Sequence, residues 1–288
     1  MAATEAATLA QPLVRPMRPA DAEAALALSQ EAGWNQTAED WRFMLGEGSA
    51  LGVYEPGRGW VASSLVVPLG QELSWISMVL VAGTRRRRGL GTMLLERCIA
   101  AVRAAGAVPG LDATELGRPV YLPLGFEDIY PISRWVLDTI PSAPAPAGYT
   151  IRPLTPGDMR ALVAYDEAQS RMRRGHVLHY LRDRAPALVA ERAGTVAGYA
   201  MGRPGRTAAQ IGPVVADTAE IAHALTARMG ESGGRTMLDV PDAHAGVAAW
   251  LKQHGATRER GYTRMTLGRF PAIAEPGKVF ALAGPELG

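Results

Sequence analysis

An internal repeat constrains the fold of this 288-residue chain more than any other feature. Residues 14–21 (VRPMRPAD) resemble residues 151–158 (IRPLTPGD), with Arg, two Pro and Asp in register. A second pair, residues 59–62 (GWVA) and 194–197 (GTVA), lies at nearly the same spacing. Two landmarks at one spacing predict tandem copies of one fold. Each first landmark is typical of a short strand and a turn, with Asp capping the helix that follows.

A segment rich in Pro and Ala separates the two copies. Residues 141–148 (PSAPAPAG) favour an extended spacer that buries little surface. The sequence therefore predicts a flexible tail over residues 1–12 and a first domain over 13–140. The linker over 141–148 then leads into a second domain over 149–288.

Composition excludes several classes of protein. Hydrophobic residues make up 48% of the chain and charged residues 20%, which suits a globular protein with buried cores. A net charge of +2 disfavours nucleic-acid binding through bulk charge. No apolar run is long enough to span a membrane, and the chain lacks a secretory leader pattern.

The cysteine and histidine content gives two further expectations. The single cysteine, Cys98, permits no intrachain disulfide and indicates a reducing, cytoplasmic location. It lies on the apolar side of a predicted helix, where a core position is expected. The five histidines lie in the second half without metal-ligand spacing, so we expect no metal. Abundant Ala and Arg, with only two Lys, are typical of a GC-rich bacterial genome.

Hydrophobic periodicity in the first half predicts a mixed α/β order. Strands are expected at 13–17, 50–54, 60–68, 73–81, 108–113 and 134–138, and helices at 20–32, 38–45, 89–105 and 119–124.

A strand followed by a basic turn is the segment of the sequence that most clearly indicates a binding site. The apolar strand 73–81 leads into residues 85–91 (RRRRGLG), which open an apolar-periodic helix. The first N–H groups of a helix lack partners, and with the helix dipole they bind phosphate. Gly89 and Gly91 let the backbone approach a pyrophosphate, and the arginines add charged hydrogen bonds. Taken only as a run of four charges, the arginines indicate a solvent-exposed surface. Their position between a strand and a helix instead indicates a phosphate-binding site.

Three landmarks resemble the GNAT acetyltransferase family. Residues 86–91 match its R/Q-x-x-G-x-G/A pattern, residues 79–81 resemble its fourth strand, and residues 121–126 (YLPLGF) resemble its Y-x-x-x-G-F signature. The second half, at 211–217 and 264–268, resembles the C-terminal module of bacterial two-module acetyltransferases. The resemblance implies an α/β (α+β) fold with two tandem GNAT-like domains. Each would be a mixed, mostly antiparallel sheet flanked by helices.

The resemblance implies that acetyl-CoA is the acyl donor. Its pyrophosphate is expected on the turn and its pantetheine arm along the fourth strand, with the Val79 N–H holding the oxyanion. The cofactor-binding residues implied are Val79, Leu80, Val81, Arg86, Arg87, Arg88, Gly89, Leu90, Gly91, Thr92 and Thr114. Thr114 stands where the family often has Asn.

Tyr121 is the implied catalytic residue, a general acid that protonates the departing thiolate when an amine attacks directly in a ternary complex. The alternative is a tyrosine that only packs against the next strand. Trp75 stands where some family members carry an acid, so no base is identified. The acceptor-binding residues implied are Trp34, Asn35, Gln36, Ser77 and Asp112. The alternatives are that Trp34 anchors its loop and that Asp112 caps a turn.

The second half lacks the phosphate motif, because Asp217 and Thr218 follow its equivalent strand, and Leu251 stands where Tyr is expected. We expect it to bind no acetyl-CoA and to wall the acceptor site. Arg171, Arg173 and Arg174 fall on a predicted helix, where a solvated face is favoured over an anion site.

The sequence thus predicts an N-acetyltransferase that acts on a small-molecule primary amine. It is expected to work as a monomer or homodimer, without nucleic-acid or membrane partners. One alternative is a non-catalytic protein that binds or senses acyl-CoA. Others are nucleic-acid binding through residues 85–88 and a two-module acetyltransferase of thiol-cofactor biosynthesis, which would need a cofactor site in the second half as well.

Overall fold

The computed structural model describes residues 13–140 and 142–288, so the predicted tail over 1–12 and Pro141 lie outside the described residues. We define the first module as β1–β6 with their helices and the second module as β7–β13 with theirs. The first contains β1 (Leu13–Met17), α1 (Ala22–Glu31), α2 (Ala38–Glu47), β2 (Ser49–Glu55), β3 (Gly59–Pro68), β4 (Leu73–Val81), α3 (Leu90–Ala104), β5 (Val108–Thr114), α4 (Arg118–Tyr121) and β6 (Glu127–Leu137). The second contains β7 (Thr150–Pro153), α5 (Met159–Ser170), α6 (Gly175–Arg182), β8 (Leu188–Arg192), β9 (Thr195–Arg203), β10 (Ala209–Ala216), α7 (Ala219–Met229), β11 (Thr236–Pro241), α8 (Ala245–Gln253), β12 (Thr257–Thr266) and β13 (Val279–Ala281).

The two modules repeat the same order of helices and strands up to β6 and β12. The predicted mixed α/β fold with a mostly antiparallel sheet is confirmed, since only β4–β5 and β10–β11 pair in parallel. No helix within the described ranges is long and apolar enough to cross a membrane.

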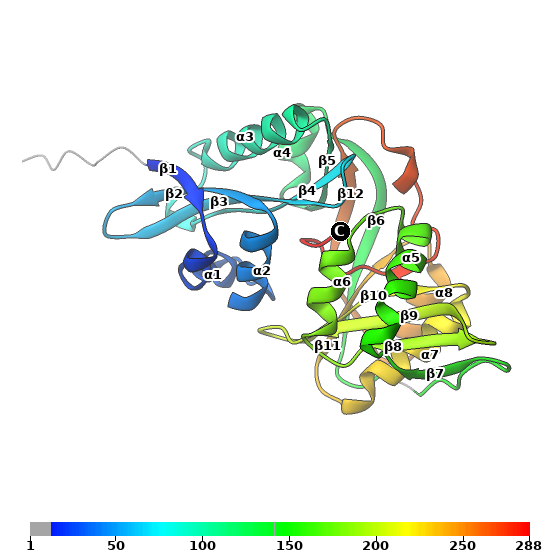
Figure 1. Ribbon diagram of the computed structural model, residues 1–288. Coiled ribbons are helices and arrows are strands. Elements are labelled where there is room, and N and C mark those ends of the chain that lie inside the picture. The colour runs from blue at the N-terminus through cyan, green and yellow to red at the C-terminus, as the bar shows by residue number, and fades with distance from the viewer. Residues whose placement is uncertain (1–12, 141) are drawn as a thin grey trace, which may run out of the picture.

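The two modules exchange their last strands. Their strands form one 13-stranded sheet in the order β1-β2-β3-β4-β5-β12-β6-β11-β10-β9-β8-β7, with β13 beside β10. β12 of the second module therefore lies between β5 and β6, and β6 of the first module lies between β12 and β11. Figure 1 shows these two long strands side by side where the modules meet. Neither module completes its own sheet.

One buried ion pair joins each exchanged strand to a neighbouring strand of the other module. Arg264 on β12 donates two hydrogen bonds of 2.9 Å to Asp112 on β5, and these residues are register partners. Arg134 on β6 makes the matching pair with Asp239 on β11, at 2.7 and 2.8 Å. All four side chains are at most 5% exposed. Both pairs have the two-pronged geometry that fits a guanidinium to a carboxylate.

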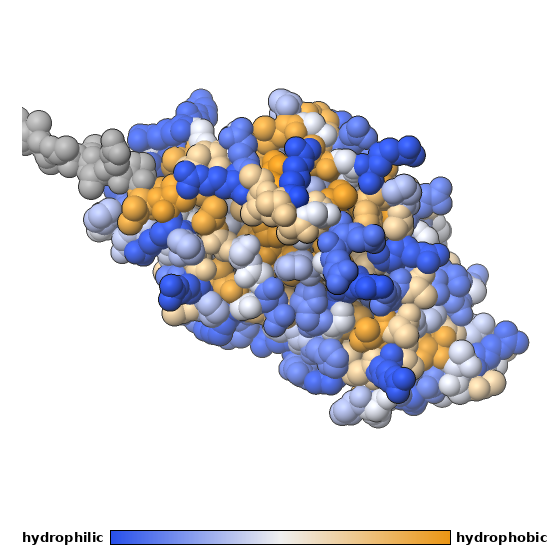
Figure 2. Space-filling view, turned by 45° about the horizontal axis from the view of Figure 1, so that its top comes forward, coloured by the Kyte–Doolittle hydropathy of each residue, from blue (hydrophilic) through white to orange (hydrophobic). Residues whose placement is uncertain are grey.

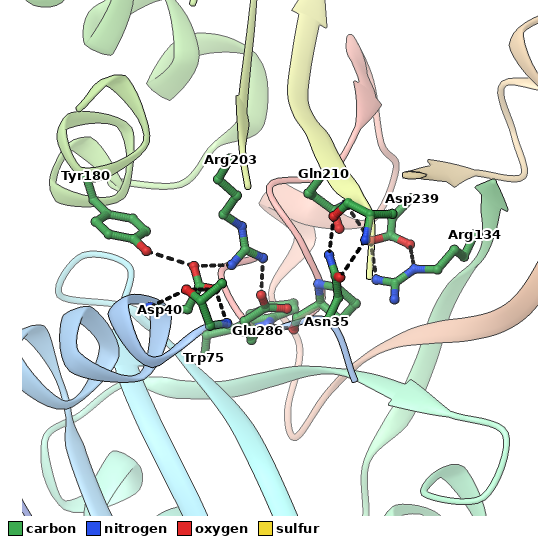
Figure 3. A network of polar contacts seen from close by, with 12 residues as sticks. Asn35, Asp40, Trp75, Arg134, Tyr180, Arg203, Gln210, Asp239 and Glu286 are labelled. Atoms are coloured by element: carbon green, nitrogen blue, oxygen red, sulfur yellow. Dashed lines mark hydrogen bonds and ion pairs between the residues drawn. The ribbon is translucent and has the colours of Figure 1, made fainter. Parts of the chain in front are cut away.

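The modules also share a core and a polar network. One hydrophobic cluster contains side chains of α1 and α2 together with side chains of α5 and α6. Next to it, Arg203 on β9 bonds to Asp40 on α2 and to Glu286 near the C-terminus (Figure 3). The Tyr180 hydroxyl donates to the same Asp40 at 2.7 Å. Burial alone raises the pKa of Asp40, but Arg203 and the Thr37 amide outweigh burial and lower it.

Two sequence expectations are corrected. The strand expected over 134–138 begins earlier, at Glu127. The expectation was too short because Pro131 interrupts the strand pattern in the sequence. In the structure the Pro131 carbonyl still accepts a hydrogen bond from the Asp242 amide. The expected helix face of arginines is wrong, since α5 ends at Ser170 and α6 begins at Gly175. Arg174 is fully buried and binds Asp166 at 2.9 and 3.1 Å.

Removing one member of an exchanged-strand ion pair should be costly. We expect Asp112→Ala to lower the free energy of unfolding by about 3–5 kcal/mol, because it leaves Arg264 buried without its counter-charge. The exposed pair between Arg118 and Asp128 provides the control, and Arg118→Ala should lower the free energy of unfolding far less. Chemical denaturation measures both. Equal effects of the two substitutions would contradict a structural role for the buried pair.

Candidate active site

The turn between β4 and α3 has the geometry of an anion site. Gly89 precedes the helix with a φ of +75°, which favours glycine. The helix ladder starts where Met93 N–H donates to the Gly89 carbonyl at 2.9 Å, so the amides of Leu90, Gly91 and Thr92 lie at the open end. A Cβ on Gly91 would lie 3.2 Å from the Val81 side chain, so glycine here lets α3 approach β4 closely.

The four arginines of this turn divide into two pairs. Arg85 binds Glu55 through two hydrogen bonds of 2.7 Å, which lower the pKa of that carboxyl. Arg86 donates to the Val81 carbonyl at 3.2 Å. Both therefore anchor the turn to the sheet. Arg87 and Arg88 are exposed, have no ion pair within the described ranges, and lie free for an anionic ligand.

β4 and β5 separate beside this turn. They pair at Leu73, Ser74 and Trp75 and not beyond, so residues 76–81 of β4 have no hydrogen-bonded partner on β5. We call this unpaired stretch between the two strands the first slot. Along the unpaired stretch of β4, Met78 and Val79 lie opposite a single residue of β3, so β4 has a β-bulge here. Met78 has a φ of +51°, and Ser63 Oγ donates to its carbonyl at 2.7 Å. Such strained backbone clusters at functional sites.

Tyr121 lies at the margin of the same cluster as Val79. Both side chains pack against the hydrophobic cluster under α3, and the Tyr121 ring is 5.9 Å from Phe126. A Cβ on Gly117 would lie within 3.2 Å of both the Tyr121 ring and Thr114 Oγ1, so these two predicted residues are neighbours. Thr114 Oγ1 also accepts from the Gly117 amide at 3.1 Å. Burial raises the pKa of Tyr121 to about 12, so its hydroxyl keeps its proton at neutral pH.

The segment around α4 exposes apolar side chains. Figure 2 shows hydrophobic patches broken by hydrophilic residues on one face of the molecule. In the part of the chain that the structure describes, the exposed large hydrophobic residues are Leu13, Leu116, Val120 and Leu122. Three of these four lie close to Tyr121 in the chain. This tyrosine therefore lies where the fold leaves apolar surface open.

The predicted acceptor residues each make contacts of their own in the structure. Asn35 is buried and joins the modules: its amide donates to the Ala208 carbonyl at 2.9 Å and accepts from Thr207 at 2.8 Å. The Trp34 carbonyl accepts from Arg206. Ser77 Oγ and Gln36 Oε1 are buried without a hydrogen-bond partner among the described residues.

The Asp112 side chain is 0% exposed in its pair with Arg264, and burial raises its pKa against the opposing charge. Its carboxylate is therefore out of contact with solvent, although the residue as a whole is half-buried. Among the residues described, no group of three or more His, Cys, Asp or Glu side chains is placed to hold a metal.

A groove that the sequence did not reveal lies beside α4. It has a volume of about 310 Å³ and is lined by Glu115, Arg118, Arg258 and Tyr262, among others. Arg258 is held by a hydrogen bond of 3.0 Å that its Nε donates to Ser133 Oγ. Its walls come from both modules, which explains why neither half of the sequence indicated it.

Comparisons with known proteins relate one part of the chain to a family. Residues 162–281 match a family model described as an acetyltransferase (GNAT) domain. The chain contains a GNAT domain. No curated protein matches the chain. The match indicates an acyltransferase.

Solved structures share the GNAT fold over nearly the whole chain. A protein from Pyrococcus horikoshii, described as a candidate acetyltransferase, superposes with a TM-score of 0.80 at 20% identity, covering 100% of this chain and 99% of its own. A GCN5-related N-acetyltransferase from Sphaerobacter thermophilus gives 0.63 at 22% identity, covering 88% and 95%. A tandem GNAT protein from the clavulanic acid biosynthesis pathway gives 0.64 at 17%, covering 90% and 100%.

The GNAT match lies on the second module, yet the slot of that module is filled. β10 and β11 pair only at Ala209 and Gln210 before they diverge. β13 pairs with β10 in the gap, and Leu282 N–H donates to the Asp239 carbonyl of β11 at 2.9 Å. A Cβ on Gly212 would lie 1.8 Å from the Leu282 carbonyl oxygen, so only glycine permits this approach. The chain thus occupies its own second slot.

The contacts of Asn35 generate a prediction. Asn35→Ala should lower the free energy of unfolding by about 1–3 kcal/mol, because it leaves the Thr207 and Ala208 amides without their acceptor. Gln30→Ala, at an exposed position on α1, is the matched control and should change little. Thermal and urea unfolding report both. An Asn35→Ala protein of unchanged stability would contradict a structural role.

Proposed function

We propose that the chain is an acetyl-CoA-dependent N-acetyltransferase with its donor site in the first module. The contrast between the two slots carries this proposal. The first slot is open and ends at a turn with free amides and the exposed Arg87 and Arg88. The second slot holds β13 and ends at Asp217, which binds Lys278 at 2.8 Å.

The residues of the first slot fit the donor. The amides of Leu90–Thr92 and the two arginines suit its phosphates, and the unpaired edge of β4 suits the amide groups of its pantetheine arm. The bulge at Met78 and Val79 leaves one residue of β4 without a partner on β3. We assign the Val79 N–H to the oxyanion of the tetrahedral intermediate. Tyr121 then donates its proton to the departing thiolate. A neutral amine attacks without a protein base. Its nitrogen loses a proton to solvent as the amide forms, and the Tyr121 phenolate takes one back, so the hydroxyl is restored.

The groove beside α4 supports a small amine as acceptor. Glu115 offers a carboxylate to an ammonium group, and Arg258 offers hydrogen-bond donors to polar groups of the same molecule. A volume of about 310 Å³ is at the lower end of the roughly 300–1,000 Å³ typical of ligand pockets. A small acceptor therefore suits the groove better than a folded protein surface.

Calorimetric titration with acetyl-CoA tests the donor site. We expect one site per chain, lost in Gly89→Trp, whose side chain would cover the turn. Gly194→Trp is the control: both glycines have positive φ, +75° and +77°, and neither would place a Cβ within 4 Å of another atom. Both variants should fold with similar strain. Absence of binding to the wild type, or two sites per chain, would contradict the proposal.

Substitution of Tyr121 tests catalysis. Tyr121→Phe should lower the turnover number by about 10²-fold or more, with acetyl-CoA affinity unchanged, because only proton donation is lost. Release of free thiol with a panel of primary amines measures the rate.

With a pKa of about 12, Tyr121 should cause no loss of wild-type activity between neutral pH and pH 9. Full activity of the Phe variant would reduce Tyr121 to a packing role, and binding without turnover of any amine would favour a sensing protein.

A further inference from the structure

The bulge in β4 is held by a hydrogen bond from a buried serine of β3. Met78 and Val79 have no register partner on β3, so strand pairing does not fix the peptide group between them. Ser63 Oγ donates to the Met78 carbonyl at 2.7 Å, and both residues are buried. Met78 has a φ of +51°, which a residue with a Cβ adopts only at an energetic cost. The Ser63 hydroxyl therefore stabilises a backbone conformation that the strand ladder does not hold.

This hydrogen bond sets the direction of the Val79 N–H. The Met78 carbonyl and the Val79 N–H belong to one planar trans peptide group, so they point in opposite directions. The carbonyl points toward Ser63 on β3. Since β4 lies between β3 and β5 in the sheet, the N–H points away from β3, toward the side of β5. The first slot lies on that side, because β5 does not pair with this part of β4.

The equivalent bulge in the second module lacks both groups. Gly212 and Pro213 of β10 lie opposite a single residue of β9, as Met78 and Val79 do in the first module. In the register pair that follows the bulge, Ala200 stands where the first module has Ser63, so no hydroxyl is present. Pro213 stands where the first module has Val79 and has no N–H. The slot that β13 fills therefore lacks the hydroxyl and the N–H that the open slot contains.

We infer that Ser63 is a positioning residue for acyl transfer: its hydroxyl fixes the Met78 carbonyl so that the Val79 N–H faces the thioester carbonyl of the donor. This inference rests on the function proposed above. Because Ser63 is fully buried, it acts through the peptide group and not by contact with the donor. An N–H fixed in advance stabilises the oxyanion without reorganisation during the reaction. Without the hydroxyl, the strained peptide group is free to turn, and its N–H loses this direction.

Calorimetry of the full chain with CoA and acetyl-CoA tests this role, because only acetyl-CoA carries the carbonyl that accepts from Val79. Ser63→Ala should weaken acetyl-CoA binding about fivefold and leave CoA binding unchanged, since one hydrogen bond to the donor is lost. With any amine that the wild type acetylates, the same variant should lower kcat at least about tenfold. Ser64→Ala is the matched control. Ser64 is equally buried and its Oγ has no hydrogen-bond partner among the described residues, so both affinities and kcat should stay at wild-type values.

The outcomes separate this inference from the proposed function. If neither CoA nor acetyl-CoA binds the wild type, the proposed function is wrong. If both bind and Ser63→Ala keeps the wild-type ratio of the two affinities, the role of Ser63 is overturned. An equal loss of both affinities also overturns it, because that pattern shows a general loss of structure. Should Ser63→Ala not fold, Ser63→Cys, whose thiol is a weaker donor, must weaken acetyl-CoA binding more than CoA binding for the inference to stand.

Discussion

The two buried pairs between Arg and Asp hold the structure together, because each closes a sheet with a strand from the other module. Arg264 reaches Asp112 from β12, and Arg134 reaches Asp239 from β6. A charge removed from water at this depth destabilises the fold unless its partner is present. The strand exchange and the ion pairs therefore require one another. The same exchange also positions Trp75 on β4, since Arg264 both binds Asp112 and stacks on the Trp75 ring.

The repeat produces two similar gaps between parallel strands, and only the second is filled by another strand. In both modules a parallel pair of strands diverges after two or three register pairs. In the first module the gap stays open beside a turn with free amides. In the second, β13 enters the gap, and Gly212 allows its backbone to pass. The second copy is thus a structural partner: its C-terminal segment fills its own slot and ends between the modules (Figure 1). There Pro285 accepts a hydrogen bond from Trp75, and Glu286 pairs with Arg203.

Local patterns in the sequence predicted local structure well. The strand at 73–81 has the predicted bounds, and Gly89 precedes α3. Both could be predicted because strand periodicity, helix periodicity and a glycine turn depend on residues that are neighbours in the sequence. Relations between distant residues were not predicted. Nothing near Asn35 indicates that its amide meets Thr207, and nothing near Arg174 indicates burial against Asp166. The Pro/Ala linker suggested separate sheets, and composition carries no information about which strand completes which sheet.

The account's central claim is that only the first slot receives the donor. Amide hydrogen exchange of the full chain, with and without saturating acetyl-CoA, tests it most directly. The account predicts added protection along Ser77–Val81 and Arg87–Thr92 and unchanged exchange along Ala209–Ala216, where β13 already pairs. Protection of Ala209–Ala216 by acetyl-CoA, or none in the first module, would contradict it.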